Sequence, residues 1–165
     1  LREYLYKRIW SKIGTESEAY YIADNTGTDM ALGGLNASLR DFAKFGQLYL
    51  NEGSWEGEQI VPKEWVAQSH TPDAPHLMPN SGELSSNEWG YGYQWWIPES
   101  LEGEFSAIGV YNQFIFVNPT ARTVIVKLSA NSEYGLTNTE ESYRENETIE
   151  FFRAITGRLT GSMPK

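Results

Sequence analysis

The chain of 165 residues has no cysteine, which excludes disulfide bonds, thiolate catalysis and cysteine-ligated metal. Basic residues are also scarce: 13 Lys and Arg stand against 22 Asp and Glu, and the formal net charge is -9. This charge repels phosphate backbones and anionic lipid, so we expect no nucleic acid and no membrane surface among the partners. A nucleophile in this chain would have to be an oxygen atom.

Long hydrophobic runs are missing as well. The sequence has no apolar stretch of about 18 residues and no basic-then-apolar start with a small-residue cleavage site. We therefore expect neither a spanning helix nor a signal peptide in it, and the compartment stays unknown. What the sequence does have is 40% hydrophobic and 14% aromatic residues, enough to bury a core.

Apolar spacing predicts helices in the first half of the chain. The first residues fit a helix that ends at Gly14, with apolar positions at Leu1, Leu5, Ile9 and Ile13. A natural domain seldom begins inside a helix, so we expect further residues of the same domain before Leu1. The helical spacing of small and apolar residues from Leu39 to Leu50 predicts a second helix, with Asn36 or Ser38 as N-cap and Gly53 as terminator. Pro62 suits the first position of a short third helix.

The second half of the chain changes character after a loop, rich in Pro, Ser, Asn and Gly, over 71–88. Aromatic and β-branched stretches over 91–97, 105–108, 112–117 and 123–129 predict antiparallel strands, because the connections between them are short. Asn138 and Glu141 make a plausible cap for a closing helix, whose apolar face includes Ile149, Phe152 and Ile155. The sequence thus predicts an α+β fold, with an antiparallel sheet of three to four strands.

We expect all of residues 1–165 to belong to one domain. Its first part, 1–88, is predicted to be mainly helical with long loops. Its second part, 89–165, is predicted to hold the strands and a C-terminal helix packed on them.

Motifs of serine hydrolysis are nearly absent. The one Ser-x-x-Lys match, Ser162 to Lys165, contains Pro164, which pushes the preceding residue out of helical geometry and makes the match a coincidence. A Tyr-x-Asn match at Tyr49-Leu50-Asn51 falls in the last turn of the second predicted helix, where core packing is favoured. His70 and His76 lack the spacing of a metal site and are expected on the surface, so we predict no metal and no cofactor.

The segment around Gly109 is the remaining candidate. A glycine that closes a strand lets a backbone N–H point outward with no side chain in the way, as an oxyanion hole requires. The alternative is a plain β-hairpin with glycine in its turn, and spacing alone favours that alternative.

Four stretches taken together resemble the C-terminal half of the β-lactamase-related, penicillin-recognising serine hydrolases. Within that group the sequence is most similar to 6-aminohexanoate-dimer hydrolases and class C-like carboxylesterases. The stretches occur in order as YLYKRIWSKIG, ALGGLNASLRDFAKFGQLYLNEGSWEGEQIVPKEWV, WGYGYQWW and FSAIGVYNQFIFVNPTARTVIVKLS. The resemblance implies a partial β-lactamase/transpeptidase-like fold, with the Ser-x-x-Lys and Tyr-x-Asn elements upstream of Leu1.

The resemblance also implies site residues. The family's Lys-Thr-Gly or His-Thr-Gly element aligns with Ala107-Ile108-Gly109, of which only Gly109 is kept, and the backbone N–H of Val110 becomes one oxyanion donor. Without the cation at Ala107, a β-lactam carboxylate has no obvious partner, so we expect a small amide or ester substrate instead.

Further substrate-binding candidates are Ile108, Tyr111, Gln113 and Trp96, for which ordinary strand packing is the alternative. Trp96 belongs to an aromatic series, with Trp89, Tyr91, Tyr93 and Trp95, that alternates along the strand predicted over 91–97. Asp24, Asn25 and Asp29 are possible pocket groups, although a solvated turn is favoured for them.

Two functions remain open. The first is a fragment of an acyl-enzyme hydrolase, inactive alone because the nucleophile is missing. The second is a non-catalytic remnant that binds partners or associates with itself through an uncovered sheet edge.

Overall fold

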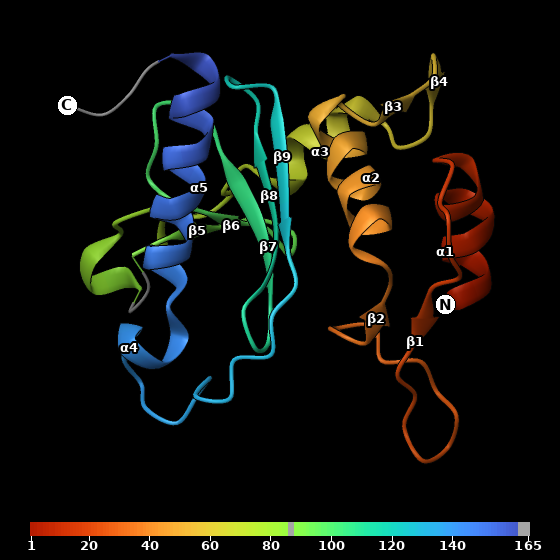
Figure 1. The fold of residues 1–165 in the computed structure, drawn as a ribbon, viewed down its shortest axis with the longest axis horizontal. Helices are drawn as coiled ribbons and strands as arrows, with labels where there is room; N and C mark the ends of the chain where they lie inside the picture. The colour runs from red at the N-terminus through yellow and green to blue at the C-terminus, as the bar shows by residue number, and fades with distance from the viewer. Residues whose placement is uncertain (86–87, 162–165) are drawn as a thin grey trace.

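A five-stranded antiparallel sheet forms the centre of the molecule, with helix α5 (Glu145–Thr160) on one face and helix α2 (Leu39–Leu50) on the other (Figure 1). The computed structural model describes residues 1–85 and 88–161. The strand order β5-β6-β7-β8-β9 follows the chain, so every connection joins neighbours. The strands are β5 (Gly90–Tyr91), β6 (Trp96–Ile97), β7 (Phe105–Gly109), β8 (Gln113–Asn118) and β9 (Thr123–Lys127). The prediction of three to four strands was therefore slightly low.

The extra strand comes from residues 91–97, which were predicted as one strand and form a hairpin instead. Tyr91 pairs with Trp96, and the N–H of Gly92 donates to the carbonyl of Trp95 at 2.9 Å. Gln94 lies at φ 68, in the left-handed region, and reverses the chain. The expected alternation of aromatic side chains along one strand was wrong for this reason.

The first half holds the three predicted helices, although the first of them ends earlier than the expected stop at Gly14. Helix α1 (Arg2–Arg8) is followed by a 3-10 turn, η1 (Trp10–Lys12), and Gly14 reverses the chain at φ 62. Helix α2 is capped by Ser38, whose hydroxyl accepts the N–H of Asp41 at 3.2 Å. Helix α3 (Lys63–Ser69) has Pro62 as its N-cap, one position before the expected one.

Short elements connect these helices. Two small antiparallel hairpins pair β1 (Tyr20–Tyr21) with β2 (Leu35–Asn36) and β3 (Ser54–Trp55) with β4 (Glu58–Gln59). The loop predicted over 71–88 contains the 3-10 turns η2 (Pro75–Leu77) and η3 (Gly82–Leu84). In the part of the chain that the structure describes, no helix has both the length and the apolar character to cross a bilayer.

The closing helix is divided in two, and its predicted cap was wrong. Arg144 lies at φ 52 and separates α4 (Glu140–Tyr143) from α5. The N-cap of α4 is Thr139, which makes no side-chain capping bond, so Asn138 and Glu141 do not form the expected pair. A left-handed residue cannot continue a helix, and α5 therefore starts afresh at Glu145.

Two apolar clusters cover the two faces of the sheet, because neighbouring strand residues point to opposite sides. The cluster facing α2 is built on Trp95, Phe105, Ile115 and Val117. The cluster facing α5 is built on Phe114, Phe116, Ile149 and Phe152. Gly46 of α2 lets that helix approach the sheet closely, because a Cβ there would lie 2.7 Å from Val124 Cγ1.

Two charged side chains join the helices to the sheet. Arg122, in the turn between β8 and β9, donates to the carbonyl of Leu50 at 3.2 Å and to Oδ1 of Asn51 at 3.0 Å. Arg153 of α5 pairs with the buried carboxylate of Glu104 at 2.5 Å. Each contact fixes the position of one helix end or face relative to the strands.

Candidate functional site

The β7–β8 turn carries the sequence-predicted site. Gly109, the last residue of β7, pairs with Gln113, the first residue of β8, so Val110, Tyr111 and Asn112 form the turn. Tyr111 lies at φ 62 and Asn112 at φ 66. Left-handed backbone costs a residue with a side chain about 1 kcal/mol, so the surroundings of this turn must hold it in shape.

The surroundings of Gly109 indicate what its lack of a side chain does locally. Its φ lies outside the left-handed region, and a Cβ built on it would lie 3.2 Å from Gln113 Cβ, its nearest neighbour. A side chain at this position would crowd Gln113, whereas the backbone conformation does not require glycine. The Gln113 amide uses that room to bind Ser129, with Nε2 donating to the Ser129 carbonyl and Oε1 accepting the Ser129 N–H at 3.1 Å.

Val110 offers a free backbone donor. The residue is 62% exposed, and its N–H donates no hydrogen bond to any residue that the structure describes. A donor placed just past the end of a strand, in a turn fixed by its neighbours, can bind an oxygen that carries developing negative charge. The oxyanion role of this N–H therefore stays a prediction.

Two of the substrate-binding candidates lie on the α5 face of the sheet. Ile108 packs against the cluster around Phe114. Trp96 pairs with Ser106, which stands three positions before Gly109 in β7; this places the backbone of Trp96 about 10 Å from the turn. Trp96 instead lines a cavity of about 230 Å³ with His76, Leu77, Ser85, Trp89 and Tyr91. The structure thus groups Tyr111 and Gln113 with Gly109 and Val110, and places Trp96 apart from them.

Of the two chance motif matches, the structure describes the Tyr-x-Asn match and not the Ser-x-x-Lys match. Tyr49 packs in the cluster facing α2, with its ring centroid 4.6 Å from that of Trp95, which confirms the core assignment. Asn51 is the C-cap of α2. The Ser162–Lys165 match lies outside the described residues.

The histidines do not form a metal site. His70 is half-buried and stacks on Phe105 with 4.2 Å between ring centroids, so the expected surface position was wrong for it. Burial lowers the pKa of His70, because the charged form loses hydration. His76 lines the cavity beside Trp96. Within 1–85 and 88–161, no group of three His, Cys, Asp or Glu side chains could hold a metal ion.

The acidic residues of the β1–β2 loop are engaged locally. Oδ1 of Asp24 accepts the N–H groups of Thr26 and Thr28 at 2.8 and 2.9 Å, which is a turn-stabilising role. Asp29 pairs with Arg2 at 2.7 Å. Hydrogen bonds from Arg2 hold the pKa of the Asp29 carboxyl at about 2. Both carboxylates thus have local partners within the described chain.

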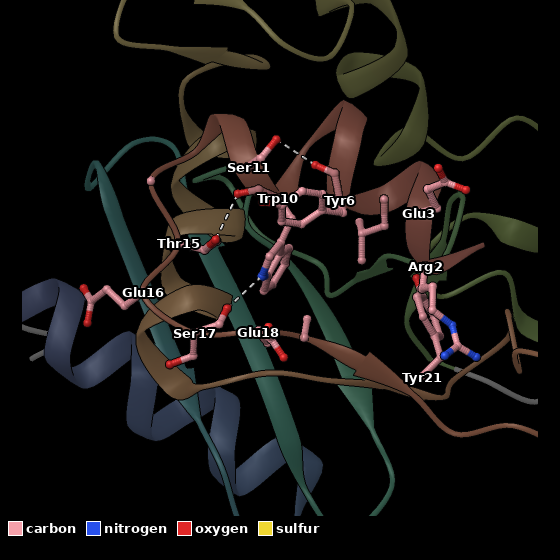
Figure 2. Close-up of a pocket in the computed structure, with 13 residues that line it drawn as sticks. Arg2, Glu3, Tyr6, Trp10, Ser11, Thr15, Glu16, Ser17, Glu18 and Tyr21 are labelled. Atoms are coloured by element: carbon pink, nitrogen blue, oxygen red, sulfur yellow. Dashed lines mark hydrogen bonds between the residues drawn. The ribbon is translucent and has the colours of Figure 1, made fainter.

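A larger hollow, of about 580 Å³, lies between α1 and the segment that follows it (Figure 2). Sequence reasoning gave no signal for it. Two of its hydroxyl groups donate to backbone carbonyls: Ser11 Oγ to that of Tyr6 at 2.9 Å, and Thr15 Oγ1 to that of Trp10 at 3.0 Å. Both hydroxyl protons are thus directed at the main chain and not at a side-chain base.

Comparison with known proteins gives a consistent result. The family model described as Beta-lactamase matches residues 4–148. The 6-aminohexanoate-dimer hydrolase of Paenarthrobacter ureafaciens is 32% identical over 123 residues, which cover 74% of this chain and 31% of the relative. The chain thus spans about a third of the length of that curated relative.

Solved structures agree in fold. A Bacillus anthracis structure, provisionally named 6-aminohexanoate-dimer hydrolase, superposes with a TM-score of 0.81 and 35% identity, over 98% of this chain and 39% of that one. A Bacteroides dorei structure, provisionally named a β-lactamase, gives a TM-score of 0.58 at 17% identity, over 91% of this chain and 50% of the other. The second likeness concerns the fold alone.

Proposed function

This chain belongs to the β-lactamase family of serine hydrolases, and from that premise we propose that it supplies the oxyanion side of an active site that cleaves an amide or ester bond. The single observation that carries the proposal is the free, exposed N–H of Val110 in a turn held by its neighbours. The nucleophilic serine comes from residues outside these 165, and the chain alone is inactive.

The proposed reaction passes through an acyl-enzyme. The serine oxygen attacks the substrate carbonyl carbon and loses its proton to a base that accompanies the serine. The carbonyl oxygen becomes negatively charged and accepts a hydrogen bond from the Val110 N–H. When the bond to the amine or alcohol breaks, the base returns the proton to the leaving group. Water then attacks the acyl carbon and loses its proton to the same base. The base returns that proton to the serine oxygen as the acid product leaves.

Charge favours a neutral or cationic substrate over an anionic one. Ala107, where the family usually has a cation, is half-buried and packs against the cluster facing α2. Its methyl group offers nothing to a carboxylate, and the net charge of -9 opposes anion approach. The proposal therefore includes a small amide or ester and excludes penicillin.

The test uses two forms of the protein. The 165-residue chain is compared with a chimera that joins it to the part of the Paenarthrobacter ureafaciens relative outside the matched region. Incubation with a fluorophosphonate should label the chimera and leave the chain alone unlabelled. Labelling of any serine in the isolated chain would refute the division of roles.

A matched pair of variants in the chimera tests Val110 itself. Val110→Pro removes the N–H, and Val110→Ala keeps it. We expect Val110→Pro to lower kcat for an ester substrate by about 10²-fold or more, as for loss of an oxyanion donor, and Val110→Ala to change kcat little. Equal effects of the two variants would show that this N–H has no catalytic role.

A second candidate function is a self-associating module without catalysis. One observation favours it: β9 ends the sheet and has a strand partner on one side only among the described residues. An uncovered edge presents N–H and C=O groups to which another strand can pair.

A further inference from the structure

We propose that Asn112 and Asn131 are positioning residues, whose paired side-chain amides hold the turn that presents the Val110 N–H. The inference rests on the proposed function of Val110 and adds a device that the resemblance did not indicate. The two residues lie 19 positions apart in the sequence. The structure brings them into direct contact behind the turn.

Asn112 is the buried member of the pair. Only 1% of the residue is exposed, although it follows the exposed residues Val110 and Tyr111 in the turn. Its Oδ1 accepts a hydrogen bond from Asn131 Nδ2 at 2.6 Å, and its Nδ2 donates to the Tyr143 carbonyl. A buried amide with both ends bonded resists rotation, because any rotation leaves polar atoms unpaired.

Asn131 connects the turn to the segment before α4. Its backbone N–H donates to the Tyr111 carbonyl at 3.4 Å, and its Nδ2 also donates to the Ser142 carbonyl at 2.9 Å. Its own Oδ1 accepts the N–H of Glu133 at 3.1 Å. One residue therefore binds the turn through both main chain and side chain.

Aromatic contacts reinforce the same connection. Tyr111 meets Tyr134 edge to face with 5.9 Å between ring centroids, and Tyr134 meets Tyr143 in the same way at 5.0 Å. Tyr143 is also the residue whose carbonyl binds Asn112. The three rings and the two amides all join the turn after β7 to the segment over 131–143.

This support matters for position because the turn is otherwise strained. Tyr111 and Asn112 both hold left-handed φ angles, directly after Val110. If they relax, the peptide group of Val110 turns with them, and an oxyanion donor works only within a few tenths of an ångström of its best distance. Asparagine tolerates left-handed backbone better than most residues, and glycine tolerates it freely. Asn112→Gly therefore deletes the amide and keeps the backbone allowed.

The first test measures order in the turn, using the complete 165-residue chain labelled with ¹⁵N. We expect order parameters of about 0.85 at Val110 and Tyr111, falling below about 0.6 in Asn112→Gly and in Asn131→Ala. The matched control is Asn80→Gly, because Asn80 also holds a left-handed φ, of 52, and lies in another loop. Unchanged order parameters in the two turn variants would overturn the proposal.

The second test separates positioning from general stability in the chimera. Asn112→Gly should lower kcat for an ester about tenfold with little change in KM, since it displaces a donor that acts in the transition state. If the turn loosens while kcat stays at the Asn80→Gly level and Val110→Pro still shows its large loss of kcat, the positioning role is wrong and the function of Val110 stands. If Val110→Pro is fully active, the proposed function itself fails.

Discussion

At the scale of single residues, the buried ion pair of Glu104 and Arg153 gives the sharpest stability prediction. Glu104 is 2% exposed, and Arg153 binds it through Nε at 2.6 Å and Nη2 at 2.5 Å. Burial raises the pKa of the Glu104 carboxyl, and the hydrogen bond from Arg153 opposes that rise without cancelling it. The folded protein thus binds this proton more tightly than the unfolded chain does, so this group favours folding most at acid pH.

We expect Arg153→Met to lower the free energy of unfolding by about 3 kcal/mol at pH 7, because it leaves a buried carboxylate without its counter-ion. The loss should shrink as the pH falls towards the ordinary glutamate value, since protonation removes the uncompensated charge. Urea unfolding at pH 7 and pH 5 measures both quantities. The double variant Glu104→Gln with Arg153→Met is the control and should recover most of the loss. A loss independent of pH would contradict this explanation.

The β7–β8 turn was predicted from the sequence only in part. The aligned glycine and the polar and apolar residues after it led to a turn at Gly109, and the structure has that turn. The left-handed angles at Tyr111 and Asn112 could not be predicted, because their cost is met by Asn131, 19 residues further along the chain. Trp96 was grouped with the site on the assumption of one continuous strand over 91–97, which the structure divides into a hairpin.

At the scale of elements, prediction succeeded where local signals agreed and failed where a turn was hidden. Helix α2 was predicted with Asn36 or Ser38 as its N-cap, and the structure has Ser38 there, because the cap and the apolar face point to the same helix. Residues 91–97 were wrongly predicted as one strand, because the aromatic residues around Gly92 and Gln94 are typical of a strand and the chain reverses there. The contact between α2 and the sheet depends on a second glycine, Gly46, whose role only the packing reveals.

We expect Gly46→Ala to destabilise the protein by about 1 kcal/mol, although alanine is the better helix former by about the same amount. The added Cβ would lie 2.7 Å from Val124 Cγ1 and 2.8 Å from Ile115 Cγ2, and β-branched side chains in a sheet cannot easily turn away. Thermal unfolding of Gly46→Ala, Val124→Ala and the double variant measures the coupling. Strictly additive effects would mean that the helix does not meet the sheet at this point.

At the scale of the whole molecule, β9 is an edge strand of the described sheet, and we predict that this edge governs how the isolated chain behaves. The strand has the sequence TVIVK, without proline and with charge only at its end, so little in it discourages another strand from pairing. We expect the purified chain to associate. Light scattering should give a mass above 18.7 kDa that rises with concentration.

Hydrogen exchange locates the contact. Amides of β9 should become more protected as the concentration rises, and amides of the inner strand β8 should not change. A monodisperse monomer at high concentration, or protection that appears elsewhere, would show that the edge is already covered. The overall arrangement of sheet and helices was within reach of the sequence, whereas the number of strands depended on the local reversal at Gln94, which no sequence signal marked.

The bond from Arg122 to the end of α2 has a consequence for folding accuracy. If β9 slipped by one residue against β8, Val124 and Val126 would turn to the opposite face, and the guanidinium would move away from the Leu50 carbonyl. The misaligned state would thus lose its apolar burial and the cation that complements the helix terminus together. Arg122 thus favours one register of β8 and β9 over the register shifted by one residue.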